Sequence, residues 1–293
     1  MKEKYTKYTP KNILWFKDIS IKDIPLVGGK GASLGEMFNK FPVPNGFCIT
    51  VHGYKAFLDE TGTGEHLHGL LDRLHVEKTD ELDKVSQDIR NLILKQKFPS
   101  ELRKEIINNY KKIKGKVAVR SSATAEDLPK ASFAGQQDTY LNVKGEENII
   151  KAVHKCWASL FTSRAIYYRE KNNFHHRNVL ISVVIQKMVD ADFAGVMFTV
   201  DPVNKKYLLI EIVKGLGEAL VSGQVTPNSY FLHKPKLEMF EKEEDFAFDE
   251  KLLKEIGKVG MKIEKHYKKP MDVELAVKNK KIYILQARPI TTL

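Results

Sequence analysis

Cysteine is scarce in this sequence, and the two cysteines present, Cys48 and Cys156, are far apart. Such a pair forms neither a disulfide framework nor a C-x-x-C redox or metal motif, so we expect both thiols to lie in the core. No apolar run approaches the roughly 20 residues of a membrane span, and the polar start of the chain is unlike a signal peptide. We therefore expect a cytoplasmic protein without a membrane partner.

Several catalytic and metal-binding motifs are also missing. The nine histidines include no H-E-x-x-H motif and lack metal-ligand spacing to carboxylates or thiols, which argues against a zinc site. No G-x-S-x-G motif occurs, and Ser121 and Ser122 have no identifiable base partner, which argues against a hydrolase nucleophile. The glycine-rich stretch 28–37 lacks the G-x-x-x-x-G-K-[ST] spacing of a Walker loop.

Acidic residues are outnumbered by basic ones, 37 against 48, which leaves a formal net charge of +11. This excess favours polyanionic ligands such as phosphates, nucleic acid or acidic protein surfaces. The lysines are mostly scattered among acidic residues, which is typical of a solvated surface. Nucleic-acid binding is therefore a minor hypothesis.

The length of 293 residues and the hydrophobic content of 42% predict a globular protein, built as one large domain or as two lobes. Helical patterns cover about 80–96, 100–114, 146–171 and 249–267, and strand-like runs dominate from Val179 onward. In the third helix apolar residues recur at three- and four-residue spacing, which predicts a buried stripe; they are Ile150, Val153, Trp157, Leu160 and Phe161.

Strands and helices interleave without a regular βαβ rhythm, so we predict an α+β fold with an antiparallel sheet in the second half. The lobe boundary is expected near Gln186 to Met188, which divides the chain into residues 1–187 and 188–293.

Two adjacent strand-like runs, 271–277 and 282–288, carry a carboxylate, an amide and a guanidinium: Glu274, Gln286 and Arg288. Because side chains alternate between the faces of a strand, Gln286 and Arg288 share one face. A three-residue turn, 279–281, would set Lys278 opposite Ile282 and Glu274 opposite Gln286, whereas a two-residue turn would put Glu274 on the other side. Glu274 and the Gln286 carbonyl could bind magnesium, and Arg288 could bind a phosphate.

Two further segments carry cations. Residues 28–37 combine glycines with Lys30 ahead of a helical pattern, so amides and a cation could face an anion, although the stretch taken alone favours a simple turn before a helix. Arg120 ends a strand-like run, from which it could reach a cleft or form an ordinary salt bridge.

Two loops are rich in small residues. The loop 131–143 would let backbone approach a ligand closely, with Gly135, Gln136 and Thr139 as contacts, although loops of this composition also serve simply to reverse the chain. In the segment 215–230, Glu218 could contact a ligand or be a first-turn acid favoured by the helix dipole.

Seven segments together resemble the N-terminal nucleotide-binding domain of phosphoenolpyruvate synthase (pyruvate, water dikinase). They are GGKGASLGEM, VAVRSSATAEDLPKASFAGQQDTYLNV, CWASLFTSRAIYYRE, VIQKMV, AGVMFTVDPV, KGLGEALVSGQVTPNSY and DVELAVKNKKIYILQARPIT. The same domain serves pyruvate phosphate dikinase and rifampicin phosphotransferase. The resemblance runs in order from about residue 14 to the last residues of the sequence.

This resemblance implies a two-lobed ATP-grasp-like fold that binds Mg-ATP between its lobes and transfers phosphate to a histidine on a separate domain, from which it passes to pyruvate or another acceptor. Lys30 and Arg120 match phosphate-contacting cations, and the segment Gly135 to Thr139 matches the phosphate-covering loop. The remaining matches are Gln186, Lys187 and Met188 beside the adenine, Glu274 and Gln286 as Mg-ATP ligands, and Arg288 as the cation that neutralises charge during transfer.

The sequence departs from the family in one respect. None of the nine histidines has the threonine- and glycine-rich context of the phosphohistidine domain, and five residues follow Arg288. We therefore expect neither that domain nor the phosphoenolpyruvate-binding barrel here, and a kinase that is incomplete without a phosphohistidine partner. The alternative is a nucleotide-binding sensor or scaffold without turnover. Leu275, where the family often has an aromatic residue, affects only the shape of the site.

Overall fold

Two antiparallel sheets organise the chain, and each belongs to its own unit. The computed structural model describes residues 11–124, 138–217, 220, 223, 225–234, 236–243 and 245–290. One unit comprises Met1–Gly35 and Asn45–Met188, and the other comprises Glu36–Pro44 and Val189–Leu293. The division into lobes at 1–187 and 188–293 stays a prediction.

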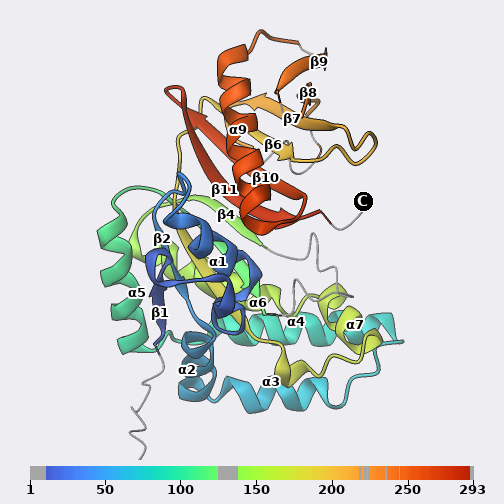
Figure 1. Cartoon of the computed structure of the whole chain (residues 1–293). Helices are drawn as coiled ribbons and strands as arrows, with labels where there is room; N and C mark the ends of the chain where they lie inside the picture. The colour runs from blue at the N-terminus through green and yellow to red at the C-terminus, as the bar shows by residue number, and fades with distance from the viewer. Residues whose placement is uncertain are drawn as a thin grey trace, which may run out of the picture. The chain divides into compact units, whose positions relative to one another are not determined.

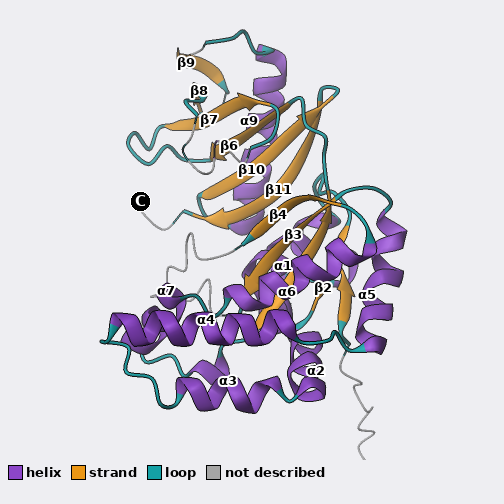
Figure 2. Ribbon diagram, turned by 180° about the vertical axis from the view of Figure 1, so that it is seen from behind, coloured by secondary structure: helices purple, strands orange, loops and turns teal. Residues whose placement is uncertain are grey.

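The first unit contains a five-stranded sheet with the order β1-β2-β5-β3-β4, in which every neighbouring pair is antiparallel. The strands are β1 (Ile13–Trp15), β2 (Gly46–Ile49), β3 (Val117–Ala123), β4 (Thr139–Val143) and β5 (Ile181–Lys187). The helices are α1 (Ile24–Phe38), α2 (Val51–Thr61), α3 (Thr63–Leu71), α4 (Thr79–Lys95), α5 (Ser100–Ile113), α6 (Glu146–Ser159) and α7 (Ser163–Lys171) (Figure 2). Short 3-10 helices cover Phe16–Asp18, Ile21–Asp23 and His176–Asn178.

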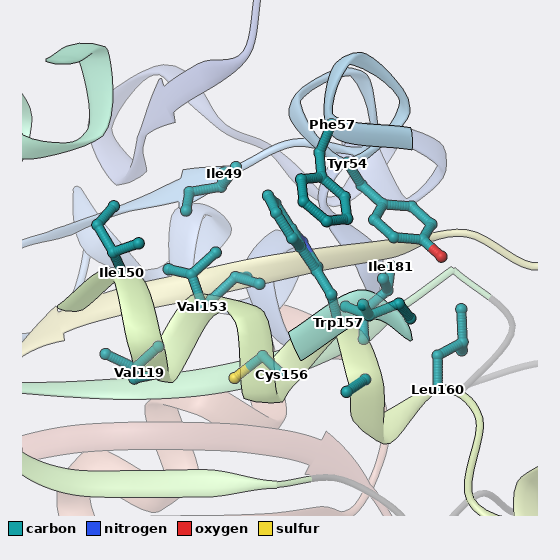
Figure 3. Close-up of a cluster of buried hydrophobic side chains, with 14 of the residues drawn as sticks. Ile49, Tyr54, Phe57, Val119, Ile150, Val153, Cys156, Trp157, Leu160 and Ile181 are labelled. Carbon is teal, nitrogen blue, oxygen red and sulfur yellow. The ribbon is translucent and has the colours of Figure 1, made fainter. Parts of the chain in front are cut away.

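One face of this sheet forms the main hydrophobic core with helices α2 to α6. Trp157 of α6 is fully buried, and its ring lies 4.7 Å from that of Phe57 and 5.7 Å from that of Tyr54, between centroids (Figure 3). Rings of this size each bury a large apolar area, so their removal costs several kcal/mol, on the order of 3–5. All five residues of the predicted stripe are buried, three of them on α6 and two, Leu160 and Phe161, just after its end.

The single helix predicted over 146–171 is wrong, because α6 ends at Ser159 and α7 begins at Ser163. Thr162 has an extended backbone, with ψ near 150°, and its hydroxyl accepts a hydrogen bond from the Ala165 amide at 3.2 Å. A threonine that caps a new helix offers the backbone an alternative to continuing the old one.

The opposite face of the first sheet is approached by the glycine-rich start of α1. Gly28 interrupts the helix with φ 68° and ψ 172°, a conformation available to glycine but strained for other residues. Here Ser122 of β3 donates to the Val27 carbonyl at 2.8 Å and accepts from the Gly31 amide at 3.2 Å. The close approach at Gly28 therefore sets the helical turn that carries Lys30 against β3.

The second unit contains a six-stranded antiparallel sheet with the order β11-β10-β6-β7-β8-β9. Its strands are β6 (Phe193–Phe198), β7 (Tyr207–Lys214), β8 (Asn228–His233), β9 (Glu238–Glu243), β10 (Met271–Lys278) and β11 (Lys281–Pro289) (Figure 1). The prediction of an α+β fold with an antiparallel sheet in the second half is confirmed.

Helix α9 (Glu250–Tyr267) covers one face of the second sheet through contacts with β6, β7 and β10. The Asp249 side chain caps it by accepting from the Lys251 and Leu252 amides at 3.0 and 3.3 Å. Gly260 permits close packing, since a Cβ there would lie 2.5 Å from the sulfur of Met197 in β6. Across the described part of the chain, no helix combines the length and apolarity required to cross a membrane.

Gly28→Ala is expected to destabilise the protein by about 2–5 kcal/mol, because a Cβ would strain the backbone and lie 2.5 Å from the Ser122 carbonyl oxygen. Gly69→Ala in α3 is the control, since nothing lies within 4 Å of its Cβ, and about 0.5–1 kcal/mol of stabilisation is expected there. Urea unfolding measures both, and equal effects would contradict the close approach.

Acid should destabilise the first unit through His154 of α6. Burial lowers its pKa from 6.5 to about 4, and its ring lies among Phe57, Phe98 and Trp157. As the pH falls from 6.5 toward 4, the unfolded chain binds a proton that the folded chain does not, so the free energy of unfolding decreases.

His154→Leu removes this proton uptake and should flatten the fall in stability by up to about 1.4 kcal/mol per pH unit. Chemical denaturation between pH 7 and 4 provides the measurement, with exposed His66→Leu as the control. Identical slopes in wild type and His154→Leu would show that His154 does not titrate in this way.

Candidate functional site

The hairpin of β10 and β11 has the two-residue turn, the shorter of the two alternatives considered. Lys278 pairs with Lys281, so the turn consists of Asn279 and Lys280, whose φ values are 49° and 61°. Two positive φ values are the signature of a type I′ turn, which matches the twist of the strands it joins. Asp192 holds the turn by accepting from the Asn279 amide and the Lys278 ammonium, each at 2.8 Å.

A bulge in β11 sets Glu274 opposite Gln286, the pair on which the magnesium hypothesis depends. Leu275 pairs with Ile284 while Glu274 pairs with Gln286, which leaves Leu285 as an extra residue in β11. A two-residue turn in a regular ladder would have put Glu274 on the other side, and the one-residue shift cancels that difference. Glu274 and Gln286 therefore lie directly opposite each other.

Glu274 and Gln286 belong to a row of residues that crosses four strands. Glu211 of β7 pairs with Val196 of β6, Val196 pairs with Glu274, and Glu274 pairs with Gln286. Paired residues in an antiparallel ladder share a face, so all four lie on the face opposite to α9. Burial raises the pKa of Glu211, and the nearby charge of Asp272 raises it further.

The neighbouring pair in the hairpin is an ion pair. Arg288 Nε and Nη2 both lie 2.9 Å from Oδ2 of Asp272, and the Asp272 side chain is only 12% exposed. Burial raises the pKa of Asp272 although Arg288 opposes the shift, and Glu274 adds to the increase. The carboxylates on this face thus repel one another, and a bound cation would relieve the repulsion.

The amide of Gln286 has an unsatisfied oxygen. Its Oε1 is buried without a hydrogen-bond partner among the described residues, a state that costs about 1–3 kcal/mol. With Glu274 opposite, it offers hard oxygen donors of the kind that Mg²⁺ prefers. No group of three His, Cys, Asp or Glu side chains suited to a metal occurs in the described part of the chain, so a bound ion would need further oxygens from a phosphate or water.

In the first unit the structure brings together the expected cations and one polar neighbour. Lys30 is 9% exposed, and its ammonium donates to the Ser121 carbonyl at 3.3 Å. Arg120 pairs across the sheet with Thr139 of β4 and with Val184 of β5. The Lys30 ammonium therefore lies at the residue next to Arg120. Arg120 does not end its strand as expected, because β3 continues to Ala123, and both cations lie at the middle of that strand.

Gln186 is 2% exposed and pairs with Gly46 and Ala118, so its side chain shares the sheet face of Arg120. Its Nε2 is buried and has no hydrogen-bond partner within the described residues. The backbone amides of Lys187 and Met188, by contrast, already donate to the carbonyls of Asn45 and Lys116, at 2.8 and 3.0 Å. A ligand at this strand would therefore meet a side-chain amide rather than those two backbone donors.

Three predicted contacts, Gly135, Gln136 and Glu218, lie outside the described residues. Two carboxylates of the polar face were missed by the sequence analysis. Asp272 could have been found, because it lies two residues before Glu274 and therefore shares its face. Glu211 could not have been found, because no local sequence pattern predicts the strand order that places β7 two strands from β10.

Comparison with known proteins identifies a family. The chain matches the model of the "Pyruvate phosphate dikinase, AMP/ATP-binding domain" over residues 24–246 and 238–293. It is 48% identical to a probable phosphoenolpyruvate synthase of Methanocaldococcus jannaschii, covering 97% of this chain and 27% of that protein. It is 40% identical to a rifampicin phosphotransferase of Bacillus cereus, covering 96% of this chain and 36% of that protein.

The chain thus spans well under half the length of these two relatives. Among solved structures, a D-alanine–D-alanine ligase from Bacillus anthracis complexed with ATP aligns with 71% of this chain and 52% of its own, at 12% identity and a TM-score of 0.31. A similarity at that score carries no argument about the site.

Gln286→Met is expected to stabilise the protein by about 1–2 kcal/mol in metal-free buffer, because a side chain of similar size replaces a buried, unsatisfied oxygen. Gln87→Met on the exposed face of α4 is the control and should change stability by less than about 0.5 kcal/mol. Denaturant unfolding gives both values. A Gln286→Met protein less stable than wild type would mean that the oxygen is satisfied in solution.

Proposed function

Because the chain belongs to the pyruvate phosphate dikinase AMP/ATP-binding domain family, we propose that it binds Mg-ATP and transfers phosphate from it to a histidine on another domain or polypeptide. The observation that carries the proposal is the buried, unsatisfied Oε1 of Gln286 directly opposite Glu274. A buried oxygen without a hydrogen-bond partner lowers the stability of the fold, so its presence here is consistent with a site in which a ligand supplies the missing interaction.

Glu274 and Gln286 are the residues that would hold magnesium, through one carboxylate and one amide oxygen. Magnesium, when bound, would neutralise charge on the phosphate oxygens as transfer proceeds. Only one or two protein oxygens are needed, because magnesium keeps several waters and takes phosphate oxygens as further ligands. Asp272 and Glu211 add negative charge to the same face and favour a cation there.

Arg288 is assigned to the charge that develops on the transferred phosphate. Its guanidinium is oriented by Asp272 through two contacts of 2.9 Å, so little side-chain entropy would be lost when it meets an oxyanion. Asp272 is therefore a positioning residue. Phosphoryl transfer requires alignment and electrostatic stabilisation more than a protein base, and this pair supplies both.

Lys30 and Arg120 of the first unit are assigned to phosphate contacts, together with Thr139 on the neighbouring strand. Lys30 is largely buried, and its ammonium donates to the Ser121 carbonyl at 3.3 Å, which places a cation next to Arg120. Gln186 is assigned to the adenine, with its Nε2 as donor, and Lys187 and Met188 border the same ligand. Gly135, Gln136 and Glu218 complete the proposed contacts.

The relatives that cover several times this length are named phosphoenolpyruvate synthase and rifampicin phosphotransferase, and both names denote phosphoryl transfer. We therefore assign the chain to the phosphotransferases and leave the final acceptor, pyruvate or another molecule, to experiment. A phosphohistidine-bearing domain is the proposed partner, and the cytoplasm is the proposed location.

The deciding experiment mixes the chain with a separately produced phosphohistidine domain and ATP labelled at the β or γ phosphate. The proposal expects label on the partner's histidine, dependent on Mg²⁺, with formation of AMP or ADP. Tight ATP binding without label or nucleotide consumption would replace it with the sensor or scaffold alternative.

Glu274→Ala and Arg288→Lys should separate binding from transfer. Removing the Glu274 carboxylate should weaken Mg-dependent ATP binding by about tenfold or more, since one of few protein oxygens is lost. Arg288→Lys keeps the charge but loses the paired geometry, so transfer should fall by about 10²-fold while ATP binding changes by less than about threefold. Calorimetry and the labelling assay measure the two effects. Unchanged binding and transfer in both variants would remove the assigned residues from the site.

A further inference from the structure

The second unit contains a cavity remote from the polar row of Glu211, Glu274 and Gln286. Its volume is about 460 Å³, and it is lined by Lys234, Met261, Glu264, Lys265, Lys268, Lys269 and Pro270. These residues come from the turn after β8, the last turns of α9 and the link to β10. Because α9 covers one face of the sheet and the polar row lies on the other, the cavity is a separate feature.

The charge of this cavity is not balanced by its own residues. Both oxygens of Glu264 are taken by the Lys234 ammonium, at 2.9 and 2.7 Å. Lys265, Lys268 and Lys269 are exposed, and none of them forms an ion pair with another described residue. Three ammonium groups therefore remain at the rim beside a pair that neutralises itself.

One of these lysines holds an unusual backbone conformation. Lys268 ends α9 with φ 55° and ψ 31°, the left-handed region where glycine is the ordinary choice. A side chain there costs about 1 kcal/mol relative to glycine. Lysines near a helix C-terminus do complement its dipole, but Lys265 already meets that need. The charge at residue 268 thus occupies a position where helix stability alone favours glycine.

The apolar residues that line the cavity indicate which chemical group would accompany an anion in a ligand. Met261 and Pro270 supply an apolar surface next to the cationic rim, and the volume is within the range of small-molecule sites. A methionine side chain adapts readily to flat or irregular apolar groups. Lysine, as a compact point charge, suits a phosphate group, which carries about −1.5 to −2 charges at neutral pH.

We propose that this cavity is a second ligand site, which binds a phosphomonoester carrying a small apolar group. The phosphate meets the ammonium groups of Lys265, Lys268 and Lys269, and the apolar group lies against Met261 and Pro270. The Pro270 carbonyl accepts from the Ile290 amide at 3.0 Å, so an occupant would contact the link between the ends of β10 and β11. The proposal does not require that the chain bind ATP.

The experiment titrates the full chain with phenyl phosphate and with inorganic phosphate while the backbone amide resonances are followed by NMR. The proposal expects saturable shifts at Lys234 and at residues 261–270, with phenyl phosphate binding about fivefold more tightly because its ring buries apolar surface. Shifts confined to residues 28–31, 120 or 272–288 would overturn it, because they would place the anion elsewhere. So would shifts spread over all lysines without saturation.

Variants make the test specific. Lys265→Gln, Lys268→Gly and Lys269→Gln together remove the rim charges, and glycine suits the backbone at 268, so phenyl phosphate affinity should fall about tenfold or more. The matched control combines Lys254→Gln, Lys258→Gln and Lys262→Gln, which removes as many exposed charges from α9 outside the cavity and should change affinity less than about twofold. Equal losses in the two triple variants would reduce the effect to general charge attraction and overturn the site.

Discussion

The pairing of Glu274 with Gln286 across β10 and β11 is the contact on which the proposed site depends. Strand side chains alternate between faces, so a slip of one residue would turn one partner toward α9 and separate the two oxygens. Two local irregularities hold the register together: the Asn279–Lys280 turn, anchored by Asp192, and the bulge at Leu285. The Asp272–Arg288 pair follows from the same register, because it lies two residues further along each strand.

The two faces of the second sheet have different roles: one packs against α9, and the other carries the proposed site. The face under α9 is apolar, and the small residue Gly260 lets the helix pack closely on Met197. Burial of this face supplies the stability that lets the other face hold repelling carboxylates and an unsatisfied amide. The raised pKa values of Asp272 and Glu211 express that strain: burial disfavours the charged form of each carboxylate, and a neighbouring carboxylate adds to the effect, in Asp272 even though Arg288 opposes it.

Much of the fold could be predicted from local pattern, and the failures have local causes. Period two identified β10 and β11 and the shared face of Gln286 and Arg288. The turn length stayed open because Asn-Lys lacks the glycine that usually marks a type I′ turn, and the bulge at Leu285 leaves no sequence signal. The break at Thr162 was missed because the apolar stripe continues through it. Glu211 depends on strand order, and the assignment of Lys30 and Arg120 rests on family resemblance rather than on spacing.

The most direct test of the central claim is the metal dependence of ATP binding by the unmodified chain, measured by calorimetry with Mg²⁺ and again with EDTA. If Glu274 and Gln286 form part of a Mg-ATP site, ATP should bind at least about tenfold more tightly with Mg²⁺, and Gln286→Met should abolish most of that difference. Equal affinity with and without Mg²⁺, or a metal effect that persists in Gln286→Met, would contradict the account.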